Sequence, residues 1–488
     1  MSAAERIDRS DLYIGGQFVK ADATARIEAI NPVSEQVVGS VPDASSADVD
    51  RAVRAARAAL PVWRRTSGAE RAQLLTAVAD GIVARADAIK ALLVQLNGSP
   101  LWWREQDVTI AQMVYRQAAA AAAALQQEEI VEGLGLKTLL HREPVGVVAA
   151  IAPWNAPWAL MSLKVANALA AGCTVVAKPS PETSLDLYLL AEAMAQAGIP
   201  DGVFNIVTGG PAAGAALVAH PGVDKVSFTG STQSGKAVAT SCAQSLKPLI
   251  AELGGKSAAV ILDDADLQDF FAIVQRECLP FSGQACFSNT RIIVPRARHD
   301  EVVEGIKATI QSLPFGDPND PATVMGPLVS AKQFHTVSGY IDSGISEGAK
   351  LVMGGNGASS NATGYYVAPT VFTDVKPDMR IFREEIFGPV LSVSSYDSEE
   401  EAIALHDATD FGLSGSVFSR DVERATNFAR QLATGQVLVN GQRGAPNAIR
   451  DMYKQSALGG GVDRINGFLL TKGISQPSAT GPLKTIFG

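Results

Sequence analysis

The chain has 488 residues, more than one hydrophobic core usually holds, so two or three packed domains are expected. Hydrophobic residues make up 47% of the chain and charged residues 19%, which is near the composition of globular proteins and excludes a largely disordered chain. The formal net charge of −9, with acidic and basic residues interspersed, excludes a basic nucleic-acid-binding surface.

Targeting and metal signals are weak throughout the sequence. The first eleven residues mix acidic and basic side chains without the apolar segment of a signal peptide, and no apolar run is long enough to span a bilayer. We therefore expect a cytoplasmic protein that does not bind a membrane. The four cysteines form neither a CxxC pair nor a disulfide framework, and the five histidines lack metal-binding spacing, so we expect reduced thiols and no metal.

Residues 47–125 form the first patterned region. They are rich in alanine and charged residues with helical periodicity, and the pattern breaks near Gly98-Ser99-Pro100, so several helices are predicted. A run of seven alanines in this region is typical of a small-residue packing face on a helix. A polar, Glu-rich passage at 126–135 follows.

Apolar runs of strand length alternate with helical segments between residues 145 and 253. This alternation predicts a parallel sheet with helices on both faces, and ligands bind such sheets at the carboxyl ends of the strands. The predicted strands are 145–151, 174–177, 203–207, 225–228 and 248–253. The turns that follow four of them are Pro153-Trp154-Asn155, Lys178-Pro179-Ser180, Thr208-Gly209-Gly210 and Gly230-Ser231-Thr232.

The turn at 230–237 nearly matches a Walker A loop. Ala237 stands where a Ser or Thr hydroxyl would bind magnesium, so a P-loop kinase or ATPase is disfavoured. A strand, a glycine turn and a helix remain, and the free backbone N–H groups of that helix can bind a pyrophosphate. A tight turn without a ligand is the alternative.

A second α/β stretch is predicted from about residue 267 to 441, with helices at 300–313 and 333–347 and a strand at 435–440. It contains Gly344-Ile345-Ser346-Glu347-Gly348, which matches the GxSxG pattern of serine hydrolases. A nucleophile elbow needs a strand before the serine and a helix after it, whereas this segment ends a helix. We interpret it as a helix C-terminus capped by Gly348.

The segment Gly283-Gln284-Ala285-Cys286-Phe287 contains a candidate nucleophile. Helical periodicity ends near Leu279-Pro280, so Cys286 is expected on a loop, although a lone cysteine is usually a core residue. Glu252 emerges beside two glycines at a predicted strand end and can act as a general base whose pKa burial would raise. The alternative for Glu252 is a surface or capping carboxylate.

Taken together, these motifs resemble the aldehyde dehydrogenase family. The resemblance extends from Asp11 to Thr471, nearly the whole chain. The segments that carry it are Asp11-Leu12-Tyr13-Ile14-Gly15-Gly16, Asn31-Pro32, Pro153-Trp154-Asn155-Ala156-Pro157, Lys178-Pro179-Ser180, Phe228-Thr229-Gly230-Ser231-Thr232, Glu252-Leu253-Gly254-Gly255-Lys256, Gly283-Gln284-Ala285-Cys286, Glu384-Glu385-Ile386-Phe387-Gly388-Pro389-Val390 and Tyr453-Lys454-Gln455-Ser456.

The resemblance implies an α/β architecture with three parts. A Rossmann-like parallel-sheet domain that binds NAD(P) is expected at 1–125 and 144–254, and a second α/β catalytic domain at 255–455. A small β extension for oligomerisation, made of a hairpin at 126–143 and a C-terminal strand within 456–488, is expected to join a homodimer or homotetramer.

The resemblance also implies the oxidation of an aldehyde to its carboxylic acid. The Cys286 thiolate would attack the aldehyde carbon, and the Asn155 amide and the Cys286 backbone N–H would stabilise the oxyanion. Loss of hydride to the nicotinamide would leave a thioester, which water activated by Glu252 would hydrolyse. Lys164 resembles a lysine of the proton path near that base.

Two alternative functions stay open. A CoA-acylating semialdehyde dehydrogenase is disfavoured because such relatives generally lack the base at Glu252. A catalytically idle structural relative is disfavoured because Cys286, Glu252 and Asn155 are all present.

NAD is the expected cofactor, with NADP as the alternative. Many NAD-using relatives carry a glutamate that repels a 2′-phosphate where this chain has Pro181, and the adjacent Glu182 is expected to serve instead. The residues expected to bind the cofactor are Trp154, Lys178, Ser180, Glu182, Gly210, Gly214, Phe228, Gly230, Ser231, Gly235, Leu253, Glu385 and Phe387.

Apolar residues are expected to line the aldehyde tunnel and favour a hydrophobic aliphatic or aromatic aldehyde, unless they only pack in the core. They are Ala156, Trp158, Leu160, Leu163, Phe281 and Phe287. Two segments depart from the family pattern. The substrate mouth is altered at Ile449-Arg450-Asp451-Met452, where Arg450 could accept an acidic substrate. Gly461 replaces a glutamate of a proton relay, and this replacement predicts slower thioester hydrolysis.

Overall fold

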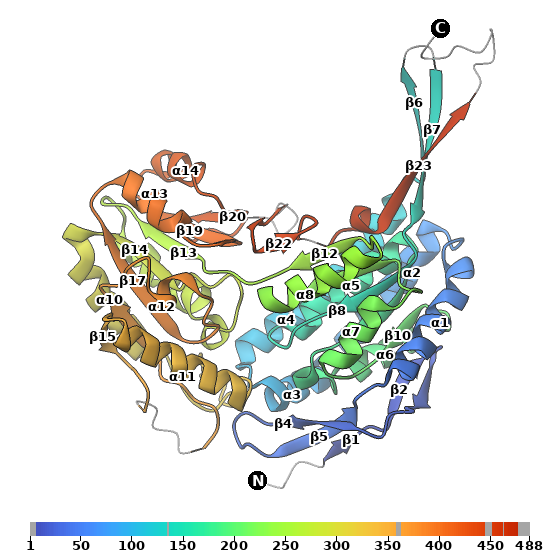
Figure 1. Ribbon diagram of the computed structural model, residues 1–488, viewed down its shortest axis with the longest axis horizontal. Coiled ribbons are helices and arrows are strands. Elements are labelled where there is room, and N and C mark those ends of the chain that lie inside the picture. Colours follow the sequence, from blue (N-terminus) through green and yellow to red (C-terminus); the bar gives the residue numbers. More distant parts are fainter. Residues whose placement is uncertain (1–5, 134–135, 358–362, 445–450, 462, 477–488) are drawn as a thin grey trace.

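The computed structural model describes residues 6–133, 136–357, 363–444, 451–461 and 463–476 (Figure 1). Figure 1 shows two lobes, each built on its own helix-covered sheet, and a narrow three-stranded sheet that projects from the first lobe. Within the described ranges, no helix combines the length and the apolar character needed to cross a membrane. The predicted α/β fold with a small β extension is confirmed.

The first lobe contains an eight-stranded sheet whose five central strands, β12 to β10, run parallel. These five strands are the apolar runs between residues 145 and 253, so the predicted parallel sheet is confirmed. In spatial order the strands are β22 (Ala457–Leu458), β12 (Leu249–Glu252), β11 (Lys225–Thr229), β8 (Val147–Ile151), β9 (Thr174–Lys178), β10 (Phe204–Ile206), β2 (Asp11–Ile14) and β3 (Gln17–Lys20).

Both faces of this sheet are buried, which explains why its strands are apolar throughout rather than alternating. In β8, Val148 and Ala150 pack in a core with α2, α4, α5 and α6, whereas Val147 and Ala149 pack with α1 and α7. The helices of this lobe are α1 (Ser46–Trp63), α2 (Gly68–Ala84), α3 (Ala86–Asn97), α4 (Leu101–Ala124), α5 (Pro157–Ala171), α6 (Leu187–Gln196), α7 (Pro211–Ala219) and α8 (Thr232–Gln244). The predicted break between helices lies between α3 and α4, where Gly98 has a left-handed φ of 68°.

The second lobe contains a seven-stranded sheet that is parallel except at the edge pair β15–β16. Its strands are, in spatial order, β15 (Lys350–Met353), β16 (Thr370–Thr373), β17 (Val390–Tyr396), β14 (Arg291–Pro295), β13 (Ala258–Ile261), β19 (Ser414–Phe418) and β20 (Gln436–Val439). Its helices are α9 (Leu267–Phe271), α10 (His299–Ser312), α11 (Ala331–Ser346), α12 (Arg380–Arg383), α13 (Glu399–Asp407) and α14 (Val422–Ala429). The predicted helices and strand of this stretch correspond to α10, α11 and β20. Gly348 follows α11 with a left-handed φ of 90°, which confirms the helix-cap interpretation and excludes a nucleophile elbow there.

The projecting sheet joins residues that lie far apart in the sequence. It is an antiparallel sheet in which β7 (Leu136–Pro144) lies between β6 (Glu128–Gly133) and β23 (Leu469–Gln476). Ile130, Leu470 and Ile474 are exposed on it. Two smaller sheets complete the fold. One has the strand order β1 (Ile7–Asp8), β5 (Val37–Pro42), β4 (Arg26–Ile30), and the other pairs β18 (Phe411–Gly412) with β21 (Tyr453–Lys454).

Candidate active site

Three polar residues of the first lobe lie at the carboxyl ends of neighbouring strands. Asn155 follows β8, Thr229 ends β11 and Glu252 ends β12, and β11 lies between the other two strands. Thr229 and Glu252 are register partners, and the Thr229 hydroxyl lies 3.5 Å from a Glu252 carboxylate oxygen. The parallel register therefore brings these side chains to one edge of the sheet, where such folds bind ligands.

Cys286 lies on a loop of the second lobe, as predicted. The loop begins with left-handed φ angles at Phe281 (46°), Ser282 (56°) and Gly283 (74°), a conformation that ordinary side chains rarely adopt. A Cβ atom on Gly283 would lie 2.2 Å from the Gly388 carbonyl oxygen, so a glycine is required there. The buried Gln284 amide bonds to three backbone groups, the carbonyls of Phe281 and Pro327 and the N–H of Val329. Packing and hydrogen bonds thus hold the loop in one conformation.

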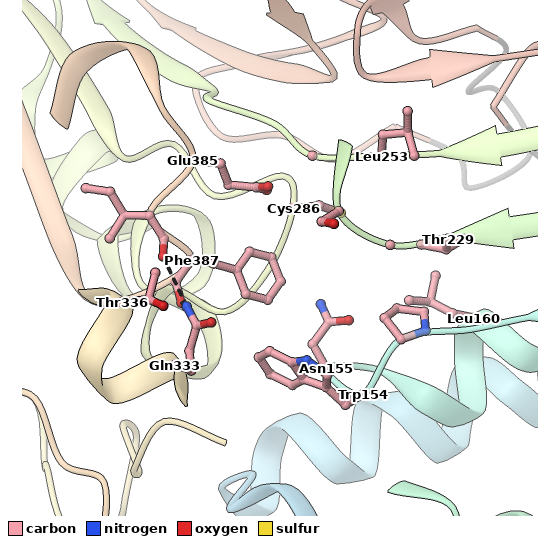
Figure 2. A pocket seen from close by; sticks show the side chains of 15 residues that line it. Trp154, Asn155, Leu160, Thr229, Leu253, Cys286, Gln333, Thr336, Glu385 and Phe387 are labelled. Carbon is pink, nitrogen blue, oxygen red and sulfur yellow. Dashed lines mark hydrogen bonds between the residues drawn. The ribbon is translucent and has the colours of Figure 1, made fainter. Parts of the chain in front are cut away.

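A cavity of about 250 Å³ lies where the two lobes meet (Figure 2). Figure 2 shows Trp154, Asn155 and Leu160 on one side of it and Glu385 and Phe387 on the other, with Cys286 between them. The structure therefore brings together the predicted nucleophile, the predicted oxyanion donor and part of the predicted cofactor site. Cys286 is partly exposed here, whereas the other three cysteines are buried.

The Asn155 amide is anchored to the nucleophile loop. Its Nδ2 donates to the Gln284 carbonyl oxygen at 2.9 Å, and its own backbone carbonyl accepts the Trp103 indole N–H at 2.8 Å. The side chain is almost fully buried. A buried amide bonded to the residue two positions before the cysteine has the fixed position that the predicted oxyanion donor needs.

Glu252 does not border the cavity, although its neighbours Thr229 and Leu253 do. Burial raises the pKa of Glu252 to about 7, while the charge of Lys164 opposes this shift and that of Asp463 adds to it. Burial, together with the negative charges of Glu252 and Glu385, raises the pKa of the Cys286 thiol to about 12. The thiol therefore needs a nearby proton acceptor, and a carboxylate with a pKa near neutrality suits that task.

Lys164 lies behind Glu252 in a closed polar cluster. Its Nζ lies 3.0 Å from a carboxylate oxygen of Asp463 and 3.1 Å from the Ser227 hydroxyl oxygen, and that hydroxyl donates to the other Asp463 oxygen at 2.7 Å. All three side chains are buried. Sequence analysis missed Asp463. Its carboxylate contacts Lys164, whereas Gly461 stands where the family pattern has a glutamate and supplies no carboxylate. The prediction of slower hydrolysis rested on that missing glutamate and stays a prediction.

The expected pyrophosphate site has a close-packed glycine turn. α8 begins after Ser231, whose hydroxyl accepts the Ser234 N–H as an N-cap, and Gly230 and Ser231 border the cavity. A Cβ atom on Gly235 would lie 2.3 Å from the Leu253 side chain. Phe228 is buried and its ring packs against Gly230. A Cβ atom on Gly230 would lie 2.6 Å from that ring. Close packing therefore requires glycine at 230 and 235, and the turn borders the cavity at Gly230 and the exposed Ser231.

The second lobe supplies a carboxylate and an aromatic ring opposite this turn. The Gly255 N–H donates to Glu385 at 3.0 Å, and burial raises the pKa of Glu385 to about 7. Phe387 has a left-handed φ of 57° and lies edge-on to Trp154, with ring centroids 5.4 Å apart. Gln333, which sequence analysis missed, donates to the carbonyls of Ile386 and Phe387 and holds this loop.

A second group of predicted cofactor residues lies outside this cavity, around the end of β9. Lys178 is buried and donates to the Pro179 carbonyl oxygen, and burial lowers its pKa to about 8 against the opposing charges of Glu182 and Asp43. The Ser180 hydroxyl donates to Glu182. Two of the predicted glycines complete the group, since Gly214 faces the Lys178 side chain and the Gly210 N–H donates to Asp43. Asp43 lies in no motif, so the sequence offered no signal for it.

The predicted tunnel residues separate into two sets. Leu160 borders the cavity, and Ala156, Phe281 and Phe287 pack with Trp102, Trp103 and Trp154 beside it. Trp158 and Leu163 instead pack against the core of the first lobe, where the Trp158 indole N–H donates to Asp186. Sequence analysis missed Trp102 and Trp103, which read as ordinary helix residues. Ile449 and Arg450 of the altered mouth lie outside the described residues.

Comparisons with known proteins agree with this geometry. The family model described as the aldehyde dehydrogenase family matches residues 18–471. A geranial dehydrogenase from Castellaniella defragrans is 44% identical over 93% of this chain and 95% of that protein. A 3-succinoylsemialdehyde-pyridine dehydrogenase from a Pseudomonas species is 42% identical over 93% of this chain and 95% of that protein.

A solved structure shares the whole fold. A variant of aldehyde dehydrogenase C from Pseudomonas syringae, in complex with NAD+ and octanal, superposes with a TM-score of 0.92. It is 39% identical, and the match covers 96% of each chain. With the family model matched over nearly the whole chain and with relatives above 40% identity, the chain belongs to the aldehyde dehydrogenase family.

Proposed function

We propose that this protein oxidises hydrophobic aldehydes to carboxylic acids with NAD+, through a thioester on Cys286. The observation that carries the proposal is that Cys286, Asn155 and Glu385 border the same cavity, at the meeting point of the two lobes. The aldehyde dehydrogenase family supports the reaction, and the complex of a relative with NAD+ and octanal supports the cofactor and an apolar substrate.

The residues around this cavity fit a dinucleotide. Ser231, at the N-terminus of α8, is exposed and borders the cavity, where a pyrophosphate can reach the helix end, and Glu385 offers its carboxylate oxygens to ribose hydroxyls. Trp154 and Phe387 would flank the nicotinamide end. When bound, NAD+ supplies a hydride acceptor.

The first stage of the reaction takes place at Cys286. Glu252 accepts the thiol proton, and the thiolate sulfur forms a bond to the aldehyde carbon while the C=O π electrons move to oxygen. The Asn155 amide and the Cys286 backbone N–H stabilise the resulting oxyanion. Re-formation of the C=O bond expels the hydride and leaves an acyl thioester on Cys286.

The second stage releases the acid. Glu252 first releases the thiol proton to solvent, and it then removes a proton from a water molecule as the water oxygen attacks the thioester carbon. The C–S bond then breaks, and the sulfur leaves as the thiolate. A base with a pKa near 7 can accept and release a proton in each turnover at neutral pH.

Glu182 supports NAD+ over NADP+. It lies one residue beyond the usual position, but it accepts the Ser180 hydroxyl and its charge acts on buried Lys178 at the end of β9. A carboxylate there would repel a 2′-phosphate.

The projecting sheet supports a homodimer or homotetramer. Its exposed apolar residues Ile130, Leu470 and Ile474 lie on β6 and β23, the two edge strands of this sheet among the described residues, and exposed apolar edge strands favour association. We propose domain divisions at residues 126, 144, 255 and 456, and a cytoplasmic location.

A matrix of cofactors and aldehydes tests the proposed function. Purified enzyme is assayed with NAD+ or NADP+ against octanal, a substituted benzaldehyde and succinic semialdehyde, with and without CoA, by nicotinamide absorbance. We expect NAD+ reduction with octanal and the benzaldehyde, without acceleration by CoA. No reduction with any aldehyde would favour an idle relative, and an acyl-CoA product would favour the acylating alternative.

A further inference from the structure

A second cavity, of about 440 Å³, begins one residue beyond the nucleophile. It lies between the start of α4 and the segment that follows β20, and its wall includes Phe287 and Trp103. Phe287 follows Cys286 directly, and the Trp103 indole donates to the backbone carbonyl of Asn155. Its volume is in the range of small-molecule sites. The cavity is therefore placed to hold the part of a substrate that extends away from the reacting carbon.

One end of this cavity is aromatic. Trp102, Trp103 and Phe287 form it, with the two indoles edge-on at 5.5 Å between ring centroids and Trp103 6.5 Å from Phe287. Both indole N–H groups already donate to backbone carbonyls, at 3.0 Å for Trp102 and 2.8 Å for Trp103. The rings thus offer faces and edges rather than polar groups, which suits a flat apolar body.

A polar wall adjoins this aromatic end and carries a guanidinium held in a fixed position. Arg443 donates from Nε and Nη2 to the two oxygens of Glu277, at 2.8 and 3.0 Å. Its guanidinium carbon also lies 4.7 Å from the centroid of the Phe287 ring. Glu277 is only 4% exposed, whereas the Arg443 side chain is 48% exposed. The carboxylate and the ring together fix an arginine that still reaches the cavity.

The backbone before Arg443 supports this placement. Gly441 borders the cavity with a left-handed φ of 69°, and a Cβ atom there would lie 2.8 Å from the Ile273 side chain. Glu277 belongs to a short π-helical segment, Val274–Cys278, whose carbonyl at Glu277 accepts the Asn289 N–H at 2.7 Å. Both partners of the ion pair therefore come from constrained backbone.

The charges that line the cavity favour a ligand that carries a hydrogen-bond acceptor. Two arginines, Arg276 and Arg443, and one carboxylate, Glu277, give a sum of +1, and the amides of Gln106 and Gln442 add donors. A guanidinium fixed in advance loses little entropy when it binds an oxygen, and a charge-assisted hydrogen bond is stronger than a neutral one.

We propose that Arg443 selects aldehydes whose body is aromatic or conjugated and whose far end carries a carbonyl or carboxylate oxygen. The aromatic body lies against the wall formed by Trp102, Trp103 and Phe287, and the terminal oxygen accepts from the Arg443 guanidinium. This inference rests on the proposed aldehyde oxidation and names its substrate class.

Three para-substituted benzaldehydes test the proposal. 4-Carboxybenzaldehyde and 4-acetylbenzaldehyde carry the oxygen, and 4-methylbenzaldehyde lacks it. We expect wild-type kcat/KM to be about tenfold higher for the oxygen-bearing aldehydes, as one charge-assisted hydrogen bond predicts, mainly through a lower KM. Arg443→Met should remove this advantage and leave 4-methylbenzaldehyde oxidation nearly unchanged. An effect on 4-carboxybenzaldehyde alone would assign the oxygen to a carboxylate.

Companion variants separate selection from folding. Arg443→Met leaves Glu277 buried without its partner, so the double variant Glu277→Gln/Arg443→Met, which removes both charges, should show the same loss of selectivity with a higher Tm. Arg65→Met, which removes an exposed arginine between α1 and α2, is the matched control and should behave as wild type.

Two results would overturn the proposal, and they differ from a failure of the proposed function. An equal fall of kcat/KM for all three aldehydes in both variants would show that the ion pair only supports the fold. Unchanged ratios in both variants would show that Arg443 does not contact the substrate. If the wild-type enzyme oxidised none of the three aldehydes, the proposed function itself would fail, and this inference with it.

Discussion

The two lobes contribute to the active site in different ways. In the first lobe, Asn155, Thr229 and Glu252 stand at or just beyond the ends of parallel strands, where the hydrogen-bonded register sets their positions. In the second lobe, Cys286 and Phe387 lie on loops with left-handed residues, which are held by the amides of Gln284 and Gln333. The difference indicates that the positions of the proposed base and oxyanion donor depend on regular structure, whereas the position of the proposed nucleophile depends on particular loop contacts.

Replacing the nucleophile should have the largest effect. Cys286→Ala removes the atom that bonds to the substrate, so we expect kcat to fall by at least about 10⁴-fold, as for other nucleophiles. NAD+ binding, measured by calorimetry, should stay near wild type because the first-lobe residues are unchanged. Cys278→Ala, a change at a buried cysteine eight residues earlier, is the matched control and should retain turnover. Substantial activity in Cys286→Ala would contradict the assigned nucleophile.

The base from the first lobe should have the next largest effect. Glu252→Gln keeps the side-chain shape but cannot accept a proton, so kcat should fall by about 10² to 10⁴-fold. Rapid-mixing absorbance should still show NADH formed in the first turnover, more slowly than in wild type because Glu252 also accepts the Cys286 thiol proton, and NADH formation should then stop as the thioester accumulates. Glu400→Gln, on the exposed face of α13, serves as the control. An equal loss of the first turnover would mean that Glu252 acts mainly before hydride loss.

The oxyanion donor should matter less than the base. Asn155→Ala removes one hydrogen-bond donor, which predicts a fall in kcat of about 10² to 10³-fold. Because Asn155 Nδ2 also holds the Gln284 carbonyl, this variant tests how the strand end supports the loop. A change in KM alone, with kcat intact, would argue against a transition-state role.

The polar cluster behind Glu252 should produce the smallest effect, a shift of the pH profile. Activity that needs the Glu252 carboxylate rises as the pH passes its pKa of about 7. The Lys164 charge lowers this pKa and the Asp463 charge raises it. Lys164→Met should therefore move the acidic limb of kcat to higher pH, and Asp463→Asn should move it to lower pH.

These opposite directions separate electrostatic tuning from loss of structure. Breaking a buried ion pair also destabilises a protein, by about 3 to 5 kcal/mol, so both variants should unfold at lower temperature. The double variant Lys164→Met/Asp463→Asn should restore the limb toward its original position. Shifts in the same direction for both single variants would refute the tuning role.

The same contrast between the lobes explains which parts of the fold and the candidate site can be predicted from the sequence alone. Apolar runs that alternate with helical segments predicted the first sheet and its strand ends. A strand that is buried on both faces of a sheet must be apolar throughout, so it can be recognised from the sequence. The motif around Cys286 predicted a loop but not its conformation, since the hydrogen bonds of Gln284 link residues up to 129 positions apart.

The residues that sequence analysis missed share this long-range character. Asp463 contacts Lys164 across 299 positions and Arg443 contacts Glu277 across 166. Neither contact follows from periodicity or local motifs, because only the folded chain brings these residues together. Trp158 shows the reverse case, in which an apolar residue near a motif packs into the core instead of the tunnel.

The most direct test of the central claim is the mass of Glu252→Gln enzyme after one turnover. The variant is mixed with NAD+ and 4-methylbenzaldehyde, quenched in acid and digested, and the peptide that carries Cys286 is analysed by mass spectrometry. We expect a toluoyl thioester on Cys286 in an amount that matches the NADH formed. NADH without an acyl group on that peptide, or an acyl group on Cys278 instead, would contradict a mechanism in which one lobe supplies the nucleophile and the other the base.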